Sequence, residues 1–497
     1  MQSEFEAPTG IPGSLDASVM AVHAPGTSAA CSASLLWDSR AGRAPRSGPN
    51  PFFPISMHNP FRAHGALALL MALVGFIVAQ DAYAAPSGRE LRVGSERSFW
   101  VIGSGDAEYD RVRATLVHDG RFARIWVDNR DTARIDRAML AELARGLDTA
   151  TPAGSRNPAK GIIENEQEVF GASPVRFKVG GKDDFLLFDI PNTATDGLTL
   201  LGYFHTKDQY ARSEVSSSNE LNMLYIDSRE GLRSVRRLLS TIAHEYQHLI
   251  QFGRNPTSER FYTEALSELA TVITGFRLPN GEYMANTNSP MFRWSDENAG
   301  HSQIDYQRGM MLMRYLYEQQ GEAYIHRLVG TKGIGVQRIA DALVAGGAGS
   351  RLDWREVLTR FAVANYLQDE GSGEFGYGSS AAAHGRRTRP AVVDIGTVPA
   401  AYRPSRARLA PYGTSYFQVD APRSLRIAVG PNDDHRVVAI TFRGDRIDVS
   451  ELGRGADHEL GDESGGIERV VLAFVSLSSE GQLVDLGVDT PTRVSMN

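Results

Sequence analysis

The sequence predicts an α+β fold in which a strand-rich segment precedes a helical one and an all-β segment ends the chain. Three observations carry this prediction. Apolar residues recur at steps of three and four over 232–249, the pattern of a core-facing helix. Short apolar runs separated by turn residues fill 91–128. Similar runs, evenly spaced, return after residue 392 and are typical of a small β-sandwich.

The chain opens with residues 1–56, which are rich in Ala, Gly, Ser and Pro and have no sustained period. Residues 57–84 then have the parts of a secretory signal peptide: a mildly basic start, an apolar run over 66–79 and the cleavage site Ala82-Tyr83-Ala84. The run is short for a membrane span. A signal peptide 56 residues inside the chain makes little physical sense. We therefore expect translation to begin at Met57, with residues 1–56 an over-extended or disordered N-terminus. A cytoplasmic arm before a signal anchor is the alternative.

The composition limits the cellular compartment and the classes of partner that we expect for this protein. Cleavage after Ala84 removes Cys31, the only cysteine, so the mature protein would depend on its core and not on disulfides. The net charge of −7 is modest, and no basic tract or nucleic-acid motif is present. We expect a secreted or periplasmic protein with no nucleic-acid partner and no membrane span after signal cleavage. The oligomeric state is not readable from the sequence.

Residues 85–230 are expected to form the strand-rich half. Asp119-Gly120 is a strong hairpin signal between two apolar runs, and it leaves His118 as an exposed turn residue. A helix is expected over 132–147. The predicted strands are 98–102, 114–117, 122–127, 185–190, 198–204 and 222–227.

The helical half, 231–370, contains the strongest local signal, His-Glu-x-x-His. Residues four apart on a helix lie one turn above each other, so His244 and His248 can hold one metal ion with Glu245 beside them. The histidines fall roughly opposite the apolar stripe, and we expect them to point away from the core into a cleft. The helix is expected to end at Gly253, a common C-cap residue.

Two surface histidines that match this pattern by chance are the alternative, and the next segment argues against it. A second helix is expected over 258–275, in which Glu264 and Glu268 are again four apart. A His₂Glu zinc site takes a carboxylate from a neighbouring helix and keeps its fourth position open for water. The pattern Glu-x-x-Ser-Glu, 16 residues after the second histidine, therefore predicts a metal centre between two helices.

These segments resemble the gluzincin zinc metallopeptidases, most closely the hyicolysin-like secreted peptidases. The sequence H-E-Y-Q-H-L-I-Q-F is followed by T-E-A-L-S-E-L-A, where those enzymes typically show H-E-F-Q-H and N-E-G-L-S-E. The resemblance is dense over 222–274 and looser to residue 367. This sequence departs from the thermolysin pattern in two ways: the spacer from His248 to Glu264 is shorter, and Thr263 replaces the usual Asn.

The resemblance implies a gluzincin-like peptidase domain and assigns roles to the motif residues. It implies that residues 222–227 form the cleft edge, where an extended peptide would pair with the backbone. Glu268 matches an acidic residue that orients a ligand histidine. The implied zinc ligands are His244, His248 and Glu264, with Glu245 as general base.

Downstream, the segment Tyr306-Gln307-Arg308-Gly309 follows a polar loop over 278–302. It resembles the Y-x-K-G of aminopeptidase-type gluzincins, and the resemblance implies that Tyr306 donates a hydrogen bond to the oxyanion. His301 is a second candidate for this role. Residues 304–309 are expected to lead into a helix that contains Met310, Leu312, Met313 and Leu316. Beyond it, we expect helices over 336–345 and 353–368, a linker over 371–391 and an accessory β-sandwich over 392–497 with strands at 415–419, 425–429, 437–442 and 470–476.

The sequence thus predicts a secreted zinc-dependent endopeptidase that acts on proteins or peptides. A zinc aminopeptidase would need a carboxylate for the substrate amine; Glu220 is well spaced for this, but the G-x-M-E-N motif is absent. A catalytically inactive binding protein on a peptidase scaffold would normally have lost Glu245 or a ligand. A zinc hydrolase of non-protein amides or esters also stays open.

Overall fold

The computed structural model describes residues 17–23, 91–104, 108–191, 198–229, 231–295, 299–346, 352–368, 370–377, 388–394, 407–421, 425–460, 466–480, 482–484 and 493–496. These residues belong to one compact unit, made of Met1–Ala24 and Leu91–Asn497. The predicted signal peptide over 57–84, and all of 1–56 except 17–23, lie outside the described residues.

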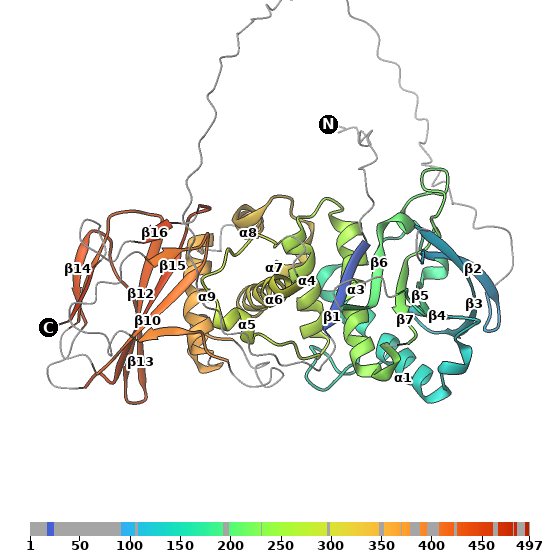
Figure 1. The fold of residues 1–497 in the computed structure, drawn as a ribbon, viewed down its shortest axis with the longest axis horizontal. Helices are drawn as coiled ribbons and strands as arrows, with labels where there is room; N and C mark the ends of the chain where they lie inside the picture. Colours follow the sequence, from blue (N-terminus) through green and yellow to red (C-terminus); the bar gives the residue numbers. More distant parts are fainter. Residues whose placement is uncertain are drawn as a thin grey trace, which may run out of the picture. The chain divides into compact units, whose positions relative to one another are not determined.

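The N-terminal half is built on a seven-stranded sheet with the order β1-β6-β7-β5-β4-β3-β2 (Figure 1). Strands β4, β5 and β7 are parallel, and the other neighbours pair antiparallel. The predicted strands of this half are all found, with slightly different ends. Their bounds are β1 Ala17–His23, β2 Glu96–Ile102, β3 Tyr109–Asp119, β4 Ala123–Asp128, β5 Asp183–Phe188, β6 Leu198–His205 and β7 Met223–Asp227.

The strand before the metal helix is not at the sheet edge. β7 pairs with β5 on one side and with β6 on the other, so the expectation that residues 222–227 form the cleft edge is wrong. The next strand outward is β6, which contacts the helix α3 (Val235–Arg254). β1 pairs antiparallel along the outer edge of β6, from Ala17 opposite His205 to His23 opposite Leu198. Strand order depends on long-range pairing, which local patterns do not encode.

The predicted hairpin between β3 and β4 is present, and a distant carboxylate holds its turn. Asp148, at the end of α1 (Arg137–Asp148), accepts hydrogen bonds from the backbone N–H groups of Arg121, Phe122 and Ala123. A Cβ on Gly120 would lie 1.8 Å from the Asp148 carboxylate, so this turn position has room only for glycine.

The two faces of this sheet pack into different apolar cores. The alternation of side chains along each strand sends Ile125 and Val127 toward the helices and Trp126 to the opposite face. α3 covers the first face, so the sheet and the helices share the larger core and fix the position of the metal motif.

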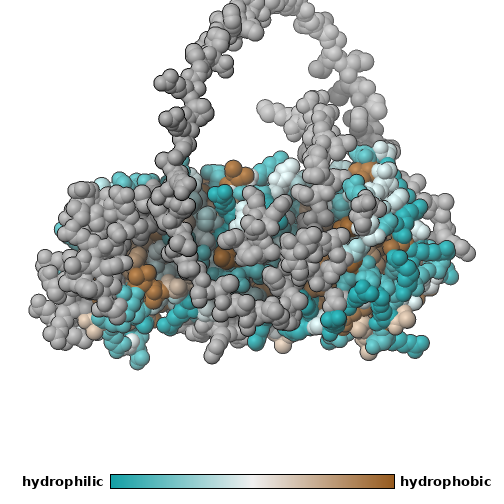
Figure 2. Space-filling view, in the orientation of Figure 1, coloured by the Kyte–Doolittle hydropathy of each residue, from teal (hydrophilic) through white to brown (hydrophobic). Residues whose placement is uncertain are grey.

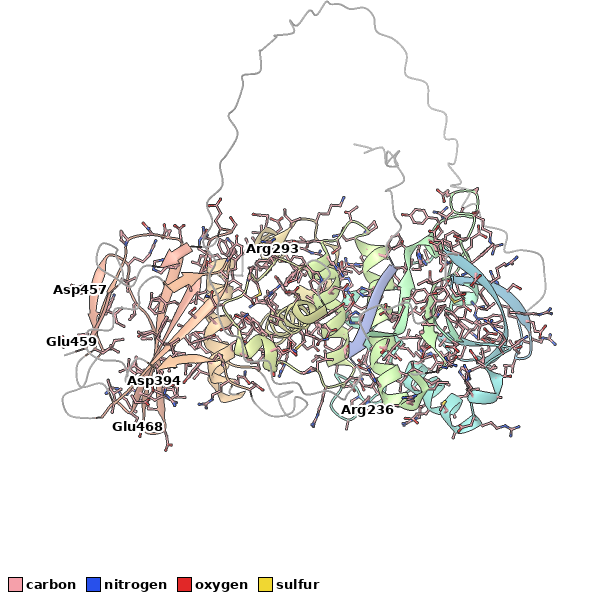
Figure 3. The ribbon with its side chains drawn as sticks, viewed as in Figure 1. Arg236, Arg293, Asp394, Asp457, Glu459 and Glu468 are labelled. Atoms are coloured by element: carbon pink, nitrogen blue, oxygen red, sulfur yellow. The ribbon has the colours of Figure 1, made fainter. Side chains whose placement is uncertain are left out.

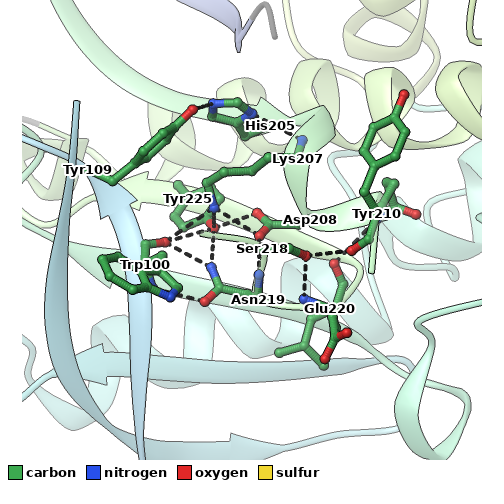
Figure 4. Close-up of polar contacts among 12 residues, drawn as sticks. Trp100, Tyr109, His205, Lys207, Asp208, Tyr210, Ser218, Asn219, Glu220 and Tyr225 are labelled. Atoms are coloured by element: carbon green, nitrogen blue, oxygen red, sulfur yellow. Dashed lines mark hydrogen bonds and ion pairs between the residues drawn. The ribbon is translucent and has the colours of Figure 1, made fainter. Parts of the chain in front are cut away.

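On the other face, a buried polar network joins β2 to the strands β6 and β7 (Figure 4). Asn219 exchanges hydrogen bonds with the backbone N–H and carbonyl of Trp100 and donates to the Tyr225 hydroxyl at 2.6 Å. Lys207 is fully buried, and its ammonium pairs with the neighbouring Asp208 at 2.9 Å. Because Lys207 and Asp208 pair with each other, this network ties the loop after β6 to the sheet without leaving either of these two charges unpaired.

The described residues contain the predicted helices and others that the sequence did not predict. α2 and α7 were missed, and α5 interrupts the predicted polar loop. Helices besides α1 and α3 have the bounds α2 Ile162–Phe170, α4 Arg260–Ile273, α5 Gly281–Ala285, α6 Ala299–Gln320, α7 Glu322–Gly330, α8 Gly335–Val344 and α9 Trp354–Leu367. Short 3-10 turns lie at Thr132–Arg134, Val179–Gly181, Thr206–Gln209, Gly231–Arg233 and Glu370–Phe375.

Several predicted helix ends differ from the structure. The helix expected from residue 132 begins at Arg137, because Asp136 caps it by accepting the Met139 N–H. Gly253 does not end α3; it lies inside the last turn, where a Cβ would meet the Pro174 ring at 2.6 Å. A close approach, and not a C-cap, explains this glycine. α6 begins at Ala299, earlier than expected.

The C-terminal segment is all-β, as expected (Figure 1). A five-stranded sheet, β13-β12-β15-β10-β8, and a three-stranded sheet, β14-β11-β17, contribute to one apolar cluster that includes Phe417, Ile427 and Phe474. Its separation as a sandwich domain, and the linker over 371–391, stay predictions. The strands are β8 Val392–Asp394, β9 Ala407–Leu409, β10 Thr414–Asp420, β11 Leu425–Val429, β12 His435–Arg443, β13 Arg446–Glu451, β14 Ala456–Glu459, β15 Arg469–Ser476, β16 Gln482–Val484 and β17 Arg493–Met496.

Hydrophilic residues cover most of the coloured surface in Figure 2, and the hydrophobic spots are small and separate. Among the described residues, no helix has the length and apolar character needed to cross a membrane.

Candidate metal centre

The metal motif lies on a helix that is covered on nearly all sides. α3 begins after Ser234, whose side chain accepts the Arg237 N–H as an N-cap. His244 is 0% exposed and His248 is 1% exposed. The expectation that the histidines project from the core into an open cleft is therefore wrong: α4 packs over them. Periodicity identified the stripe facing the sheet, but not the second helix that buries the opposite face.

Three atoms from α3 and α4 converge at one point. His244 Nε2 and His248 Nε2 are 3.1 Å apart, and Glu264 Oε2 lies 3.3 Å from the first and 3.6 Å from the second. A tetrahedral zinc ion with ligand bonds of about 2.0–2.2 Å would separate its ligand atoms by roughly 3.3–3.6 Å. Glu264 Oε2 is buried and has no hydrogen bond among the described residues. The donor set and its spacing fit this ion.

Two further residues set the tautomers of the histidines. His244 Nδ1 lies 3.1 Å from Glu268 Oε1, so its proton faces the carboxylate and Nε2 keeps its lone pair. Ser267 donates to Gln247 Oε1 at 2.7 Å, and its hydroxyl oxygen can then accept the proton of His248 Nδ1 at 3.0 Å. Both Nε2 atoms thus present lone pairs to the same point.

The pKa shifts of the two histidines run in opposite directions, and a bound metal ion would have to displace the second proton that His244 otherwise retains. Burial lowers the pKa of His248 to about 3. Burial also acts to lower the pKa of His244, but the nearby carboxylates of Glu264 and Glu268 outweigh it and raise this pKa well above its usual value. Burial acts to raise the pKa of Glu264, and the two histidines more than reverse this, so it falls. A carboxylate that stays ionised when buried is a suitable metal ligand.

Glu245 lies beside this point. Its carboxylate has an atom within 4.8 Å of the ligand nitrogens of His244 and His248. Its Oε2 accepts the backbone N–H of Phe204 at 3.0 Å, so the side chain reaches from α3 to β6. The candidate base and the candidate ligands therefore share one site with the sheet's β6 strand.

Tyr306 also reaches the site, from the second turn of α6. Its ring centroid is 6.1 Å from that of His244 and 5.0 Å from that of Trp294. Burial raises the Tyr306 pKa well above its usual value, with Glu264 and Glu268 adding to the rise, so the hydroxyl keeps its proton. His301 belongs to α6 as well, but its side chain lies outside the described residues.

The other sequence candidates lie elsewhere. Glu220 accepts the Arg212 N–H at 2.9 Å within the loop between β6 and β7. His118 is half-buried, with Nε2 3.7 Å from the Asp148 carboxylate.

Three residues near the site were not predicted to act there. Ser267 and Gln247 stand inside the two motifs, where their letters give no sign of a role in orienting His248. Glu166 lies in the missed helix α2 and is 0% exposed. Burial raises its pKa well above the usual value, while the nearby His244 acts in the opposite direction. Only its acidic run, Glu-Asn-Glu-Gln-Glu, was visible in the sequence, and such runs usually face solvent.

Comparisons with known proteins support a metallopeptidase. No protein-family model matches the chain. A relative among characterised proteins is the neutral metalloprotease ShpI of Staphylococcus hyicus, 27% identical over 172 residues. These residues are 33% of this chain and 35% of the relative, so the chain spans about a third of that protein's length.

Proposed function

We propose that this protein is a secreted zinc-dependent endopeptidase of the gluzincin type, similar to the hyicolysin-like peptidases. The observation that carries the proposal is the convergence of two imidazole nitrogens and one carboxylate oxygen from α3 and α4 at separations of 3.1, 3.3 and 3.6 Å. The second carboxylate, on Glu245, lies next to this set, as hydrolysis requires. The partial match to a neutral metalloprotease supports the same class.

In this proposal, His244, His248 and Glu264 hold zinc, which supplies a Lewis acid that makes water nucleophilic near neutral pH. Glu245 accepts the proton of the attacking water and later passes it to the leaving amine. Tyr306 donates a hydrogen bond to the carbonyl oxygen as negative charge develops there.

The substrate would bind as an extended strand along β6. Glu245 touches the backbone of Phe204 on this strand, so a peptide paired with the β6 edge would pass the candidate base. The edge accepts a strand in this geometry, because residues 17–23 pair along it antiparallel. If the mature chain begins after residue 84, as the signal peptide predicts, those residues leave and the edge becomes free for substrate.

The test is Glu245→Gln, which keeps shape and hydrogen bonding but cannot accept a proton. Cleavage of an internally quenched peptide with a blocked N-terminus should fall about 10²–10⁴-fold, while zinc content stays near that of wild type. A variant that keeps half its activity would exclude Glu245 as the base. A free aminoacyl chromogen, run in parallel, separates endopeptidase from aminopeptidase. Wild-type protein that holds zinc but cleaves neither substrate would favour an inactive scaffold or a different hydrolase.

A further inference from the structure

An arginine near the candidate metal centre has no carboxylate partner among the described residues. Arg260, the first residue of α4, is exposed, and in the part of the chain that the structure describes it makes no hydrogen bond or ion pair. Most other arginines near a carboxylate in this chain are paired, as Arg308 is with Asp305 at 2.7 Å. An exposed arginine can simply be solvated, so its position has to decide its role.

Two aromatic rings connect Arg260 to the candidate metal ligand His244. Its guanidinium carbon lies 5.4 Å from the ring centroid of Trp294, a cation–π contact. Trp294 meets Tyr306 edge to face at 5.0 Å, and Tyr306 is 6.1 Å from the ring of His244. Both Trp294 and Tyr306 are half-buried, so the series runs from the solvent to the buried centre.

Arg260 also lies on the side of α4 that carries the candidate metal ligand Glu264. Arg260 precedes Glu264 by four residues on α4, so the two lie on the same side of the helix. An anionic group bound at the centre would therefore be attracted by Arg260.

We propose that Arg260 is a specificity-determining residue that binds a carboxylate of the peptide substrate next to the scissile bond. The proposal rests on the proposed peptidase function. A guanidinium is planar and carries its donors at its edge, so one that lies over the Trp294 ring can still bind a carboxylate. The carboxylate has two possible sources, an acidic side chain inside the peptide or a free C-terminus.

The experiment uses the zinc-loaded full chain and matched internally quenched peptides. One set is blocked at both ends and carries Glu, Gln or Lys at each position flanking the cleaved bond. A second pair ends near that bond in a free carboxylate or an amide. The variants are Arg260→Ala, Arg260→Glu and, as a control, Arg236→Ala. Arg236 is also an exposed arginine over an aromatic ring, 5.6 Å from Phe276, but it lies in the first turn of α3, two turns before His244 (Figure 3).

We expect wild type and Arg236→Ala to prefer the carboxylate peptide over its neutral partner by about 3- to 10-fold in kcat/KM, a preference that shrinks as salt rises. Arg260→Ala should lose the preference, and Arg260→Glu should favour Lys. A preference for internal Glu in the end-blocked peptides would identify an acidic side chain as the source of the carboxylate. A preference for the peptide with a free C-terminal carboxylate would identify the C-terminus. Equal loss on all peptides, or an unchanged preference in Arg260→Ala, would overturn the proposal.

A binding measurement keeps this test independent of catalysis. Labelled versions of the same peptides are titrated into Glu245→Gln protein with and without Arg260→Ala, and anisotropy is followed. If wild type cleaves no peptide, the proposed function fails, but a carboxylate preference in binding that Arg260→Ala removes would still support this site. Binding without that preference contradicts it.

Discussion

At the scale of single residues, Glu264 and Glu268 are four apart on α4 and both contact His244, yet they contact different nitrogens. Glu264 faces Nε2, the atom shared with His248, while Glu268 faces Nδ1 on the far side of the ring. The sequence supplied two candidate glutamates at helical spacing, and only the tertiary arrangement of α3 and α4 distinguishes their contacts.

This difference predicts unequal losses. Glu264→Ala removes one of the three proposed ligands and should abolish zinc binding. Glu268→Ala removes only the partner of Nδ1, and it should weaken zinc affinity or activity by about 10–100-fold. Zinc content after dialysis against a graded series of chelator concentrations measures both. The opposite order would mean that the two roles are exchanged.

Tyr306 gives the second residue-scale prediction. If its hydroxyl meets the oxyanion only as charge develops, Tyr306→Phe should lower kcat about 10²–10³-fold with little change in KM, zinc content or Tm. The alternative is a packing role against Trp294, in which case Tyr306→Phe would be nearly fully active and Tyr306→Ala would be harmful. His301→Ala tests the other candidate donor, and a kcat loss there alone would move the role to His301.

At the scale of elements, the site depends on how closely α4 and α6 approach. Gly309 lies one turn after Tyr306, and a Cβ on it would be 2.8 Å from the Cβ of Ala265, the neighbour of Glu264. Two helices can pack at this distance only because one of them has no side chain at the contact. The contact positions both Tyr306 and Glu264.

Gly309→Ala should therefore separate α6 from α4. We expect a net loss of about 0–2 kcal/mol in unfolding free energy, because an overpacking cost of about 1–3 kcal/mol is offset by about 1 kcal/mol from better helix propensity. Activity should fall too, and adding Ala265→Gly should restore part of it. The control is Gly281→Ala, where no atom lies within 4 Å of the new Cβ. Denaturant titration and kcat/KM measure the effects; a fully active, stable Gly309→Ala would contradict the close approach.

The elements also show what the sequence could predict. Alternation and turn residues located the strands β2 to β7 within a few residues, because these signals are local. The motif spacing placed five side chains that the structure brings together, His244, Glu245, His248, Glu264 and Glu268. The position of β6 between β7 and β1 and the burial of His244 could not be predicted, because each depends on packing partners far along the chain. Ser267 was inside a recognised motif, but its bond to His248 depends on the relative rotation of two helices.

At the scale of the whole molecule, three carboxylates, Glu245, Glu264 and Glu268, are buried around two histidines. Such a cluster is costly without a cation at its centre, so a bound metal should contribute to stability as well as to chemistry. A ligand present at 100 times its Kd stabilises the folded state by about 2.7 kcal/mol. Metal removal should therefore lower Tm and not only activity.

Zinc dependence of the proposed peptidase activity is tested most directly by one titration on the protein that starts at Ala85. Zinc content, cleavage of an end-blocked peptide and Tm are followed as a chelator is added and zinc is then returned. If the protein is a zinc-dependent peptidase, it should hold about one zinc per chain. Activity and Tm should fall together as the zinc is removed and recover together when it is restored. Peptide cleavage that persists after all metal has been removed would contradict zinc dependence.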